Sequence, residues 1–141
     1  MNKQIICGTA GIVGGFISNL CGGWTATMTT LVIMMCIDYV SGLMVAGVFH
    51  NSTKTESGAL ESRAGWKGLC RKGMTLLIVL VSYRLDLALG TAYVQEAVAI
   101  GFIANEGISI IENAGLMGIP LPEVLIKAID ILNNKEEKVI E

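Results

Sequence analysis

Long apolar stretches separated by short polar segments dominate the hydropathy pattern of this chain. A helix needs about 20 apolar residues to cross the hydrocarbon core of a membrane, and several stretches approach that length. They cover residues 5–23, 27–49, 73–92 and 93–117. The last one is less apolar than the others. The pattern therefore predicts an all-α membrane protein with three to four transmembrane helices.

A different pattern follows Pro120. Apolar residues recur there at the spacing of one helix face, which predicts an amphipathic helix over residues 121–135. These residues are Leu121, Leu125, Ala128, Ile129 and Leu132. Such a helix suits either an interfacial or partner-binding role, or a short solubilising cap on the helix bundle, and the pattern leaves both interpretations open.

The composition supports the membrane assignment. Of the 141 residues, 52% are hydrophobic and 16% are charged, whereas about 25% of the residues in a typical soluble domain are charged. No charged residue lies between Gln4 and Ile37. These values exclude a disordered chain and argue against a water-soluble domain, and the length fits one membrane domain over residues 1–141. Basic residues form no dense arm or stripe, which argues against a nucleic-acid partner.

The basic residues predict the orientation, because short loops rich in Lys and Arg stay in the cytoplasm. Half of the ten basic residues lie in the central segment of residues 50–72: Lys54, Arg63, Lys67, Arg71 and Lys72. The turn at residues 22–26 has none. We therefore expect the central segment and the N-terminus on the cytoplasmic side, whereas the side that holds the C-terminus stays open.

Small residues repeat along the first predicted span every three or four positions: Gly8, Gly11, Gly15, Ser18 and Gly22. Small side chains at this spacing let the backbone of a second helix approach closely. Gly42, with the nearby Ala46 and Gly47, offers a place for such a partner in the second span. The stripe can serve packing within one chain or between chains. The short turn between the two spans favours the first alternative, a helical hairpin.

Asp38 lies near the middle of the second predicted span. An acidic group at that depth costs about 2.5–3.5 kcal/mol on insertion scales, so it must face protein or water. We expect it to pair with Arg84, either as a structural contact or as a charge that becomes hydrated when the helices rearrange. Asp86 cannot share a helix face with Arg84 and is predicted to point elsewhere, toward the outer interface.

Polar residues also gather on one side of the fourth predicted helix. At 100° per residue they fall within an arc of about 120°: Gln95, Asn105, Glu106, Ser109, Glu112 and Asn113. An arc of this width is typical of a water-filled lumen or a polar bundle interior. The alternative is the solvated face of an interfacial helix.

The sequence contains no pattern typical of catalysis. It has one His and four Cys without the spacing of metal ligands, and its glycine-rich segment lacks the Lys-Ser/Thr of a phosphate-binding loop. The sequence therefore predicts a protein that is not an enzyme and that binds neither a cofactor nor a metal.

Several short motifs occur in an order and spacing that are typical of one family. They are Asp38-Tyr-Val-Ser-Gly42, the segment Ser62–Lys72, Arg84-Leu-Asp86, the segment Asn105–Asn113, and Gly118-Ile-Pro120-Leu-Pro122. On these motifs the chain resembles the toxin-secretion/phage-lysis holin family, which includes the holin-like protein of the clostridial toxin locus. The resemblance reaches from about Leu31 to Leu132.

The resemblance implies a pore former without enzymatic activity. Holins of this kind accumulate in the bacterial inner membrane, oligomerise and open lesions that let endolysin reach the cell wall, and some relatives are thought to release large toxins. The implied partners are other copies of the chain, the lipid bilayer, an endolysin and an antiholin. Roles in packing and pore formation carry over to the motif residues Asp38, Gly42, Arg71, Lys72, Asp86, Glu106, Glu112 and Asn113.

Two other classes of function stay open. A small transporter or channel subunit for ions or metabolites would use Asp38 and Arg84 as a site near the midplane of the membrane. The short chain and the absence of an inverted sequence repeat argue against it. A membrane adaptor would instead recruit a partner through the amphipathic C-terminal helix.

Overall fold

The computed structural model describes residues 2–140, and in the last helix it describes the side chains of residues 123–132, 134 and 135. The described residues form five helices and no strand, so the prediction of an all-α fold is confirmed. The helices are α1 (Lys3–Leu20), α2 (Ala26–Gly47), α3 (Ser62–Leu89), α4 (Val94–Leu116) and α5 (Glu123–Ile140).

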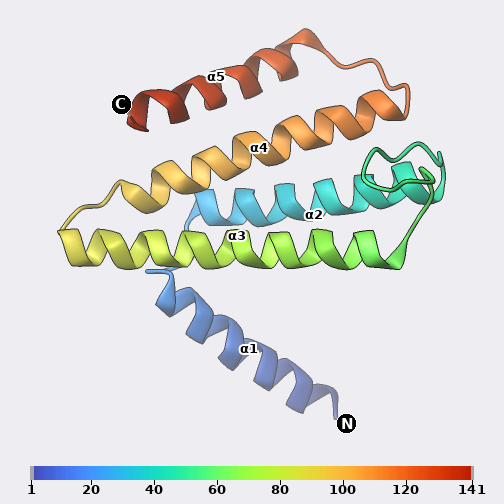
Figure 1. Cartoon of the computed structure of the whole chain (residues 1–141). Helices are drawn as coiled ribbons and strands as arrows, with labels where there is room; N and C mark the ends of the chain where they lie inside the picture. The colour runs from blue at the N-terminus through green and yellow to red at the C-terminus, as the bar shows by residue number, and fades with distance from the viewer. Residues whose placement is uncertain (1, 141) are drawn as a thin grey trace.

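Three helices, α2, α3 and α4, pack side by side, and α5 covers α4 (Figure 1). On α2 and α4 the packing is built from one mainly apolar stripe, with residues three or four positions apart on a common face. The buried core consists of Met28, Leu31, Met35, Val79 and Ile103. α4 is the central helix, because it contacts α2, α3 and α5.

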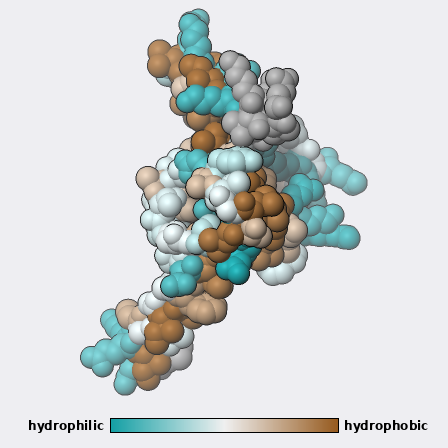
Figure 2. Space-filling view, turned by 90° about the vertical axis from the view of Figure 1, so that its left-hand side faces the viewer, coloured by the Kyte–Doolittle hydropathy of each residue, from teal (hydrophilic) through white to brown (hydrophobic). Residues whose placement is uncertain are grey.

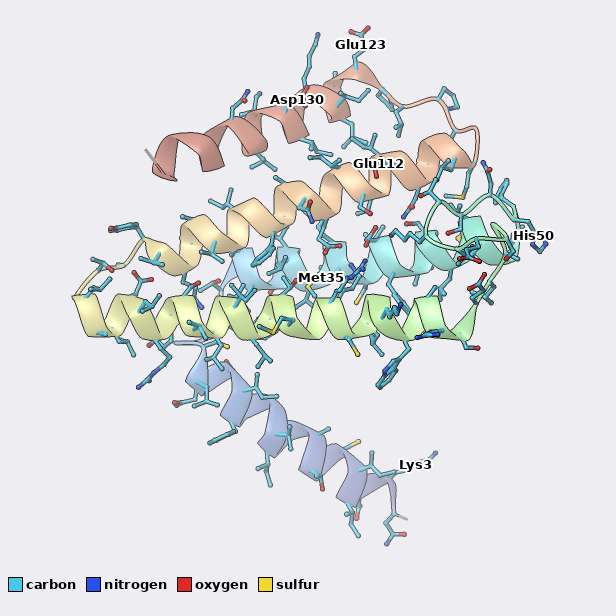
Figure 3. The ribbon with its side chains drawn as sticks, viewed as in Figure 1. Lys3, Met35, His50, Glu112, Glu123 and Asp130 are labelled. Atoms are coloured by element: carbon cyan, nitrogen blue, oxygen red, sulfur yellow. The ribbon has the colours of Figure 1, made fainter. Side chains whose placement is uncertain are left out.

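The first helix, α1, projects away from the bundle, and Lys3 lies at its far end (Figures 1 and 3). None of its residues is buried, and apolar side chains are exposed along it (Figure 2). A Cβ atom added at Gly8, Gly11 or Gly15 would meet no other part of the chain within 4 Å. The predicted hairpin, with this stripe packed against the second span of the same chain, is therefore wrong.

The turn between α1 and α2 explains this arrangement. Gly22 and Gly23 adopt φ angles of 79° and 101°, a region that favours glycine because it has no side chain. Gly22 also lies against the aromatic ring of Tyr83, with which any larger side chain would overlap. The turn before α2 thus lies against α3, and the chain leaves the turn in a direction that takes α1 away from the bundle (Figure 1).

Two described helices, α2 and α4, are long and apolar enough to cross a membrane by length and composition, whereas the hydropathy pattern predicts three to four. α1 has 18 residues and begins with the polar pair Lys3 and Gln4. α3 has 28 residues, but Lys72 precedes its apolar part, and Arg84 and Asp86 interrupt it. The way in which α3 sits in a membrane therefore depends on where these charges point.

α3 begins at Ser62, well before the predicted start of the third span at residue 73. The polar connection after α2 is correspondingly shorter, and the basic residues Lys67, Arg71 and Lys72 lie on the helix. The helix ends at Gly90, which has a φ of 68°. A glycine in this left-handed conformation commonly terminates a helix.

The predicted amphipathic C-terminal helix corresponds to α5, which packs against α4. Ile129 is buried at this contact. A Cβ atom on Gly107 of α4 would lie 3.0 Å from Ile129 Cδ1, so the glycine provides the space that the isoleucine fills. Glu123 lies on the outer side of α5 (Figure 3). In this chain the helix therefore covers α4, while Val124 and Ile131 on it stay exposed.

Candidate functional site

The centre of the bundle contains a charged triad that joins three helices. Lys72 of α3 places its Nζ atom 2.7 Å from Asp38 Oδ2 of α2 and 2.5 Å from Glu106 Oε2 of α4. The three side chains are largely shielded, with 14% of Lys72 and 9% of each acidic side chain exposed. A charge-assisted hydrogen bond of this length is strong when water is excluded. The triad therefore links all three core helices at one level.

Asn113 extends the triad along the interface between α2 and α4. Its amide nitrogen donates to Asp38 Oδ1 at 3.2 Å and to Ser41 Oγ at 2.8 Å. It lies 3.8 Å from where Gly42 would carry a Cβ atom, so Gly42 leaves room for the amide. We call Asp38, Ser41, Lys72, Glu106 and Asn113 the buried polar cluster. Among the described residues, no buried side-chain polar atom lacks a hydrogen-bond partner, as expected for a polar group in a packed interior.

The helical repeat of the sequence brings these residues together. On α2, Asp38 belongs to the same buried stripe as Met28, Leu31, Met35 and Val45. On α4, Glu106 and Asn113 follow Ala99 and Ile103 at intervals of three, four or seven residues. Packing the apolar members of each stripe therefore carries the polar members into the interior.

The cluster does not balance its own charge. When all three groups are ionised, two carboxylates face one ammonium group, which leaves an excess of one negative charge. Removing one partner from a buried ion pair is costly, because the remaining charge loses its compensation without regaining water. Lys72 is therefore the residue on which both acidic groups depend.

The predicted pair of Asp38 and Arg84 is wrong. Arg84 is exposed and lies about three helical turns further along α3 than Lys72. The residues on the inward face of α3 recur at alternating intervals of three and four positions. Arg84 does not belong to this series. The residues of this face are Gly65, Gly68, Lys72, Thr75, Val79, Ser82 and Asp86, all buried or half-buried. This spacing is the signal in the sequence that identifies Lys72 as the partner.

Asp86 is buried and caps the N-terminus of α4, whereas its position at the outer interface of the membrane stays a prediction. Its Oδ1 accepts hydrogen bonds from Val94 N at 3.0 Å and from Thr91 Oγ1 at 2.6 Å, and its Oδ2 accepts one from Gln95 N at 2.9 Å. Tyr93, at the usual capping position, provides no side-chain hydrogen bond. Asp86 of α3 thus accepts hydrogen bonds from the free backbone amides at the start of α4. Its negative charge also lies at the positive end of the α4 helix dipole.

Some residues of the predicted polar arc of α4 are buried in the structure, and others are exposed. Glu106 and Asn113 are buried in the cluster, and Gln95 is half-buried and donates from Nε2 to the Cys21 carbonyl at 3.1 Å. Ser109 is half-buried, and Asn105 and Glu112 are exposed; Glu112 lies on the surface of α4 in Figure 3. Part of the arc therefore forms a polar bundle interior within a single chain.

A polar cleft leads from the surface to the triad. It has a volume of about 770 Å³ and is bounded by α2, α3, α4 and the connection of residues 48–61. Asp38, Lys72 and Glu106 line its inner end, and Asn105 and Ser109 line the α4 side. The ribbons of α3 and α4 diverge toward the end of the bundle where this connection lies (Figure 1). The charged triad is thus accessible from one end of the bundle.

Residues 15–134 match the model of the bacteriophage holin family. The chain belongs to this family. The resemblance to holins drawn from the sequence motifs is thereby confirmed. Holins are not a family of enzymes, and the family together with the two apolar helices indicates a membrane protein. Within the part of the chain that the structure describes, no group of three His, Cys, Asp or Glu side chains is placed to hold a metal ion.

This holin-family chain is similar to proteins from bacteria and from a phage. An uncharacterized protein of Clostridium perfringens is 35% identical over 139 residues, which covers 96% of this chain and 97% of the relative. One of Halalkalibacterium halodurans is 35% identical over 136 residues, 92% of this chain and 95% of the relative. A protein of Bacillus phage phi105 named a probable holin is 27% identical over 112 residues, 79% of this chain and 77% of that protein. No solved structure matches the chain.

Proposed function

We propose that this chain is a holin: it accumulates in the inner membrane of a bacterium, oligomerises and opens lesions through which endolysin, or a toxin, leaves the cytoplasm. Membership of the holin family supports this role. The structural observation that carries the proposal is the buried polar cluster around Lys72. A passive membrane anchor has no need of three charged side chains at the centre of its helix bundle, since each is costly to place in a membrane.

The cluster suggests how one chain can exist in a closed and an open form. While α2, α3 and α4 are packed together, Lys72 compensates Asp38 and Glu106, and the membrane stays sealed. When the helices separate within an oligomer, the same side chains become the polar lining of a water-filled lesion. The buried polar cluster therefore holds the helices closed, and its opening determines when the lesion forms.

We propose that three to four helices cross the membrane. α2 and α4 qualify by length and composition. α3 can cross beside them because Lys72 and Asp86 point into the bundle, where their charges are paired or hydrogen-bonded. α1 can cross as a further helix. In this topology the N-terminus and the basic residues Lys67 and Arg71 lie in the cytoplasm.

The free face of α1 supports homo-oligomer formation. The stripe Gly8, Gly11, Gly15, Ser18 and Gly22 is the kind of surface on which helices associate in lipid. Within the chain, neither Gly8, Gly11 nor Gly15 has a neighbour at its Cβ position. A second copy of the chain is therefore the partner proposed for this face, with an endolysin as the cargo of the lesion and an antiholin as a regulatory partner. A nucleic-acid partner is not proposed.

Expression in a bacterium tests the function. Induced expression is expected to stop growth abruptly after a delay, to abolish the membrane potential and, when a cytoplasmic endolysin is also produced, to lyse the cells. Prolonged high expression with an intact membrane potential would exclude the holin function. The transporter alternative has lost its specific support, because Asp38 and Arg84 do not form a common site.

A further inference from the structure

Three basic residues form one wall of the polar cleft. Arg63, Lys67 and Arg71 follow one another at intervals of four residues on α3, and each lines the cleft. Residues four positions apart on a helix differ by about 40° in direction, so the three side chains share a face. All three are exposed. The ion pairs among the described residues involve Lys72 and Lys127 and none of these three. This basic wall therefore has no anionic partner within the described chain.

The remaining charges of the cleft, among them the one excess negative charge of the triad, compensate the wall only in part. At the inner end, Lys72 is paired with both acidic groups of the triad. At the mouth, Lys54 adds a further positive charge, while Glu56 and Glu61 are acidic. The carboxylate of Glu61 accepts a hydrogen bond from Ser57 Oγ at 3.0 Å. The mouth therefore carries more positive than negative charge, with hydroxyl and amide donors across from it on α4.

The wall lies on the cytoplasmic side of the triad in the topology proposed above. The apolar part of α3 begins after Lys72, so Arg63, Lys67 and Arg71 precede the segment that would enter the hydrocarbon. Trp66 lies among them and is 67% exposed, and tryptophan is enriched at the membrane–water interface. A cleft with a basic wall at this level faces the phosphate groups of the cytoplasmic leaflet.

We propose that this cleft binds an anionic phosphate group and that, in the membrane, the group is the phosphodiester of an anionic lipid headgroup. Two arginines provide planar groups with several donors each, and a lysine adds a compact positive charge, which together can recognise phosphate oxygens. A volume of about 770 Å³ accommodates a small headgroup, since sites for small molecules measure about 300–1,000 Å³. A bound headgroup would bridge α3 to α4 directly above the triad. The inference rests on the proposed membrane topology and not on pore formation.

The test compares lipid retention by the full-length protein and its variants. The protein is extracted in detergent and exposed to equal amounts of phosphatidylglycerol and phosphatidylcholine, and the lipids that remain bound are measured by mass spectrometry. We expect the wild type to retain phosphatidylglycerol preferentially. Lys67→Gln and Arg71→Gln are each expected to reduce this preference about fivefold, the contribution of one basic residue near a charged membrane surface. Arg84→Gln removes a basic residue of α3 outside the cleft and is expected to leave it unchanged.

Two further experiments tell a lipid phosphate from a soluble phosphate, and a lost binding site from a misfolded protein. Displacement of the lipid by millimolar inorganic phosphate would move the assignment from a lipid to a soluble phosphate and overturn the lipid site. Arg71→Lys, which keeps the charge, is expected to recover most of the retention. Equal losses in Arg84→Gln and Arg71→Gln, or no lipid preference in the wild type, would overturn the proposal. If the wild type lyses cells but shows no lipid preference, the lipid site is rejected and the holin function is not. If it shows the lipid preference but does not lyse cells, the holin function is rejected and the lipid site is not.

Discussion

Lys72 Nζ lies 2.7 Å from Asp38 Oδ2 and thereby ties the first half of α3 to the middle of α2. The same ammonium group holds Glu106 of α4, so one side chain connects the three core helices. This relationship gives the closed bundle an ion-paired contact that all three core helices share.

Replacing Lys72 by methionine is expected to destabilise the closed bundle strongly. The substitution keeps a long unbranched side chain but leaves two neighbouring carboxylates without their cation, which costs about 3 kcal/mol of unfolding free energy. Thermal unfolding in detergent, followed by circular dichroism, measures the loss. Arg84→Met is the matched control, because Arg84 is exposed and lies outside the cluster. A loss of similar size in both variants would show that Lys72 has no special role.

A double-mutant cycle between Asp38 and Lys72 tests whether the contact itself carries the effect. Asp38→Asn is expected to cost less than Lys72→Met, because Lys72 keeps Glu106 and the asparagine can still accept a hydrogen bond from Asn113. In the double variant the two losses are expected to be less than additive by about 1 kcal/mol or more, as for residues in direct contact. Additive losses in the thermal unfolding of the four proteins would mean that the two side chains act independently.

Asp86→Ala is expected to loosen the start of α4 without opening the rest of the bundle. The variant loses two hydrogen bonds to the first turn of α4 and one to Thr91 just before it, and loss of a helix cap costs about 0.5–2 kcal/mol. Amide hydrogen exchange at Val94 and Gln95 reports the change directly and should become faster. Exchange at Asn113, at the other end of α4, is the internal control. Unchanged exchange at the first turn would reject the capping role.

Gly107→Val is expected to displace α5 from α4. A Cβ atom at this position already lies 3.0 Å from Ile129 Cδ1, and overpacking of a filled contact typically costs about 1–3 kcal/mol. Limited proteolysis at Lys127 measures the release of the helix. Adding Ile129→Ala restores space and is expected to slow the cleavage of the Gly107→Val protein. Failure of this second substitution to do so would show that the two residues are not in contact.

Gly11→Leu is expected to reduce the association of copies without affecting the stability of one chain. Gly11 has no neighbour at its Cβ position within the chain, whereas close helix association in lipid requires small residues at the contact. Chemical crosslinking in membranes measures the oligomers, and thermal unfolding measures the chain. Val13→Leu, an exposed substitution on α1 outside the stripe, is the control. Unchanged crosslinking of Gly11→Leu would remove the stripe from the interface.

Local features of the fold could be predicted because they depend on residues close in sequence. The apolar stretches give α2 and α4 to within a few residues, and the spacing of Leu125, Ile129 and Leu132 gives α5. The arrangement of α1 could not be predicted in this way. The turn between α1 and α2 meets α3 where Gly22 lies against Tyr83, two residues far apart in the sequence.

The site was predicted only in part for the same kind of reason. Asp38, Glu106 and Asn113 stand out because polar groups are rare in apolar helices, whereas Lys72 belongs equally well to a basic loop. Only the extension of α3 back to Ser62 places Lys72 on the inward stripe of that helix. The choice between Lys72 and Arg84 as the partner of Asp38 therefore required the register of the whole helix.

The central claim, that the buried polar cluster determines when the membrane opens, is tested most directly by the timing of lysis for Glu106→Gln and Glu112→Gln. The two substitutions are chemically identical and lie on the same helix, but Glu106 contacts Lys72 while Glu112 is exposed. Each variant is expressed with an endolysin at matched protein levels, and the time from induction to loss of culture turbidity is recorded. We predict that Glu106→Gln shifts this time severalfold and that Glu112→Gln lyses at the same time as the wild type. Identical timing in all three proteins would contradict the claim.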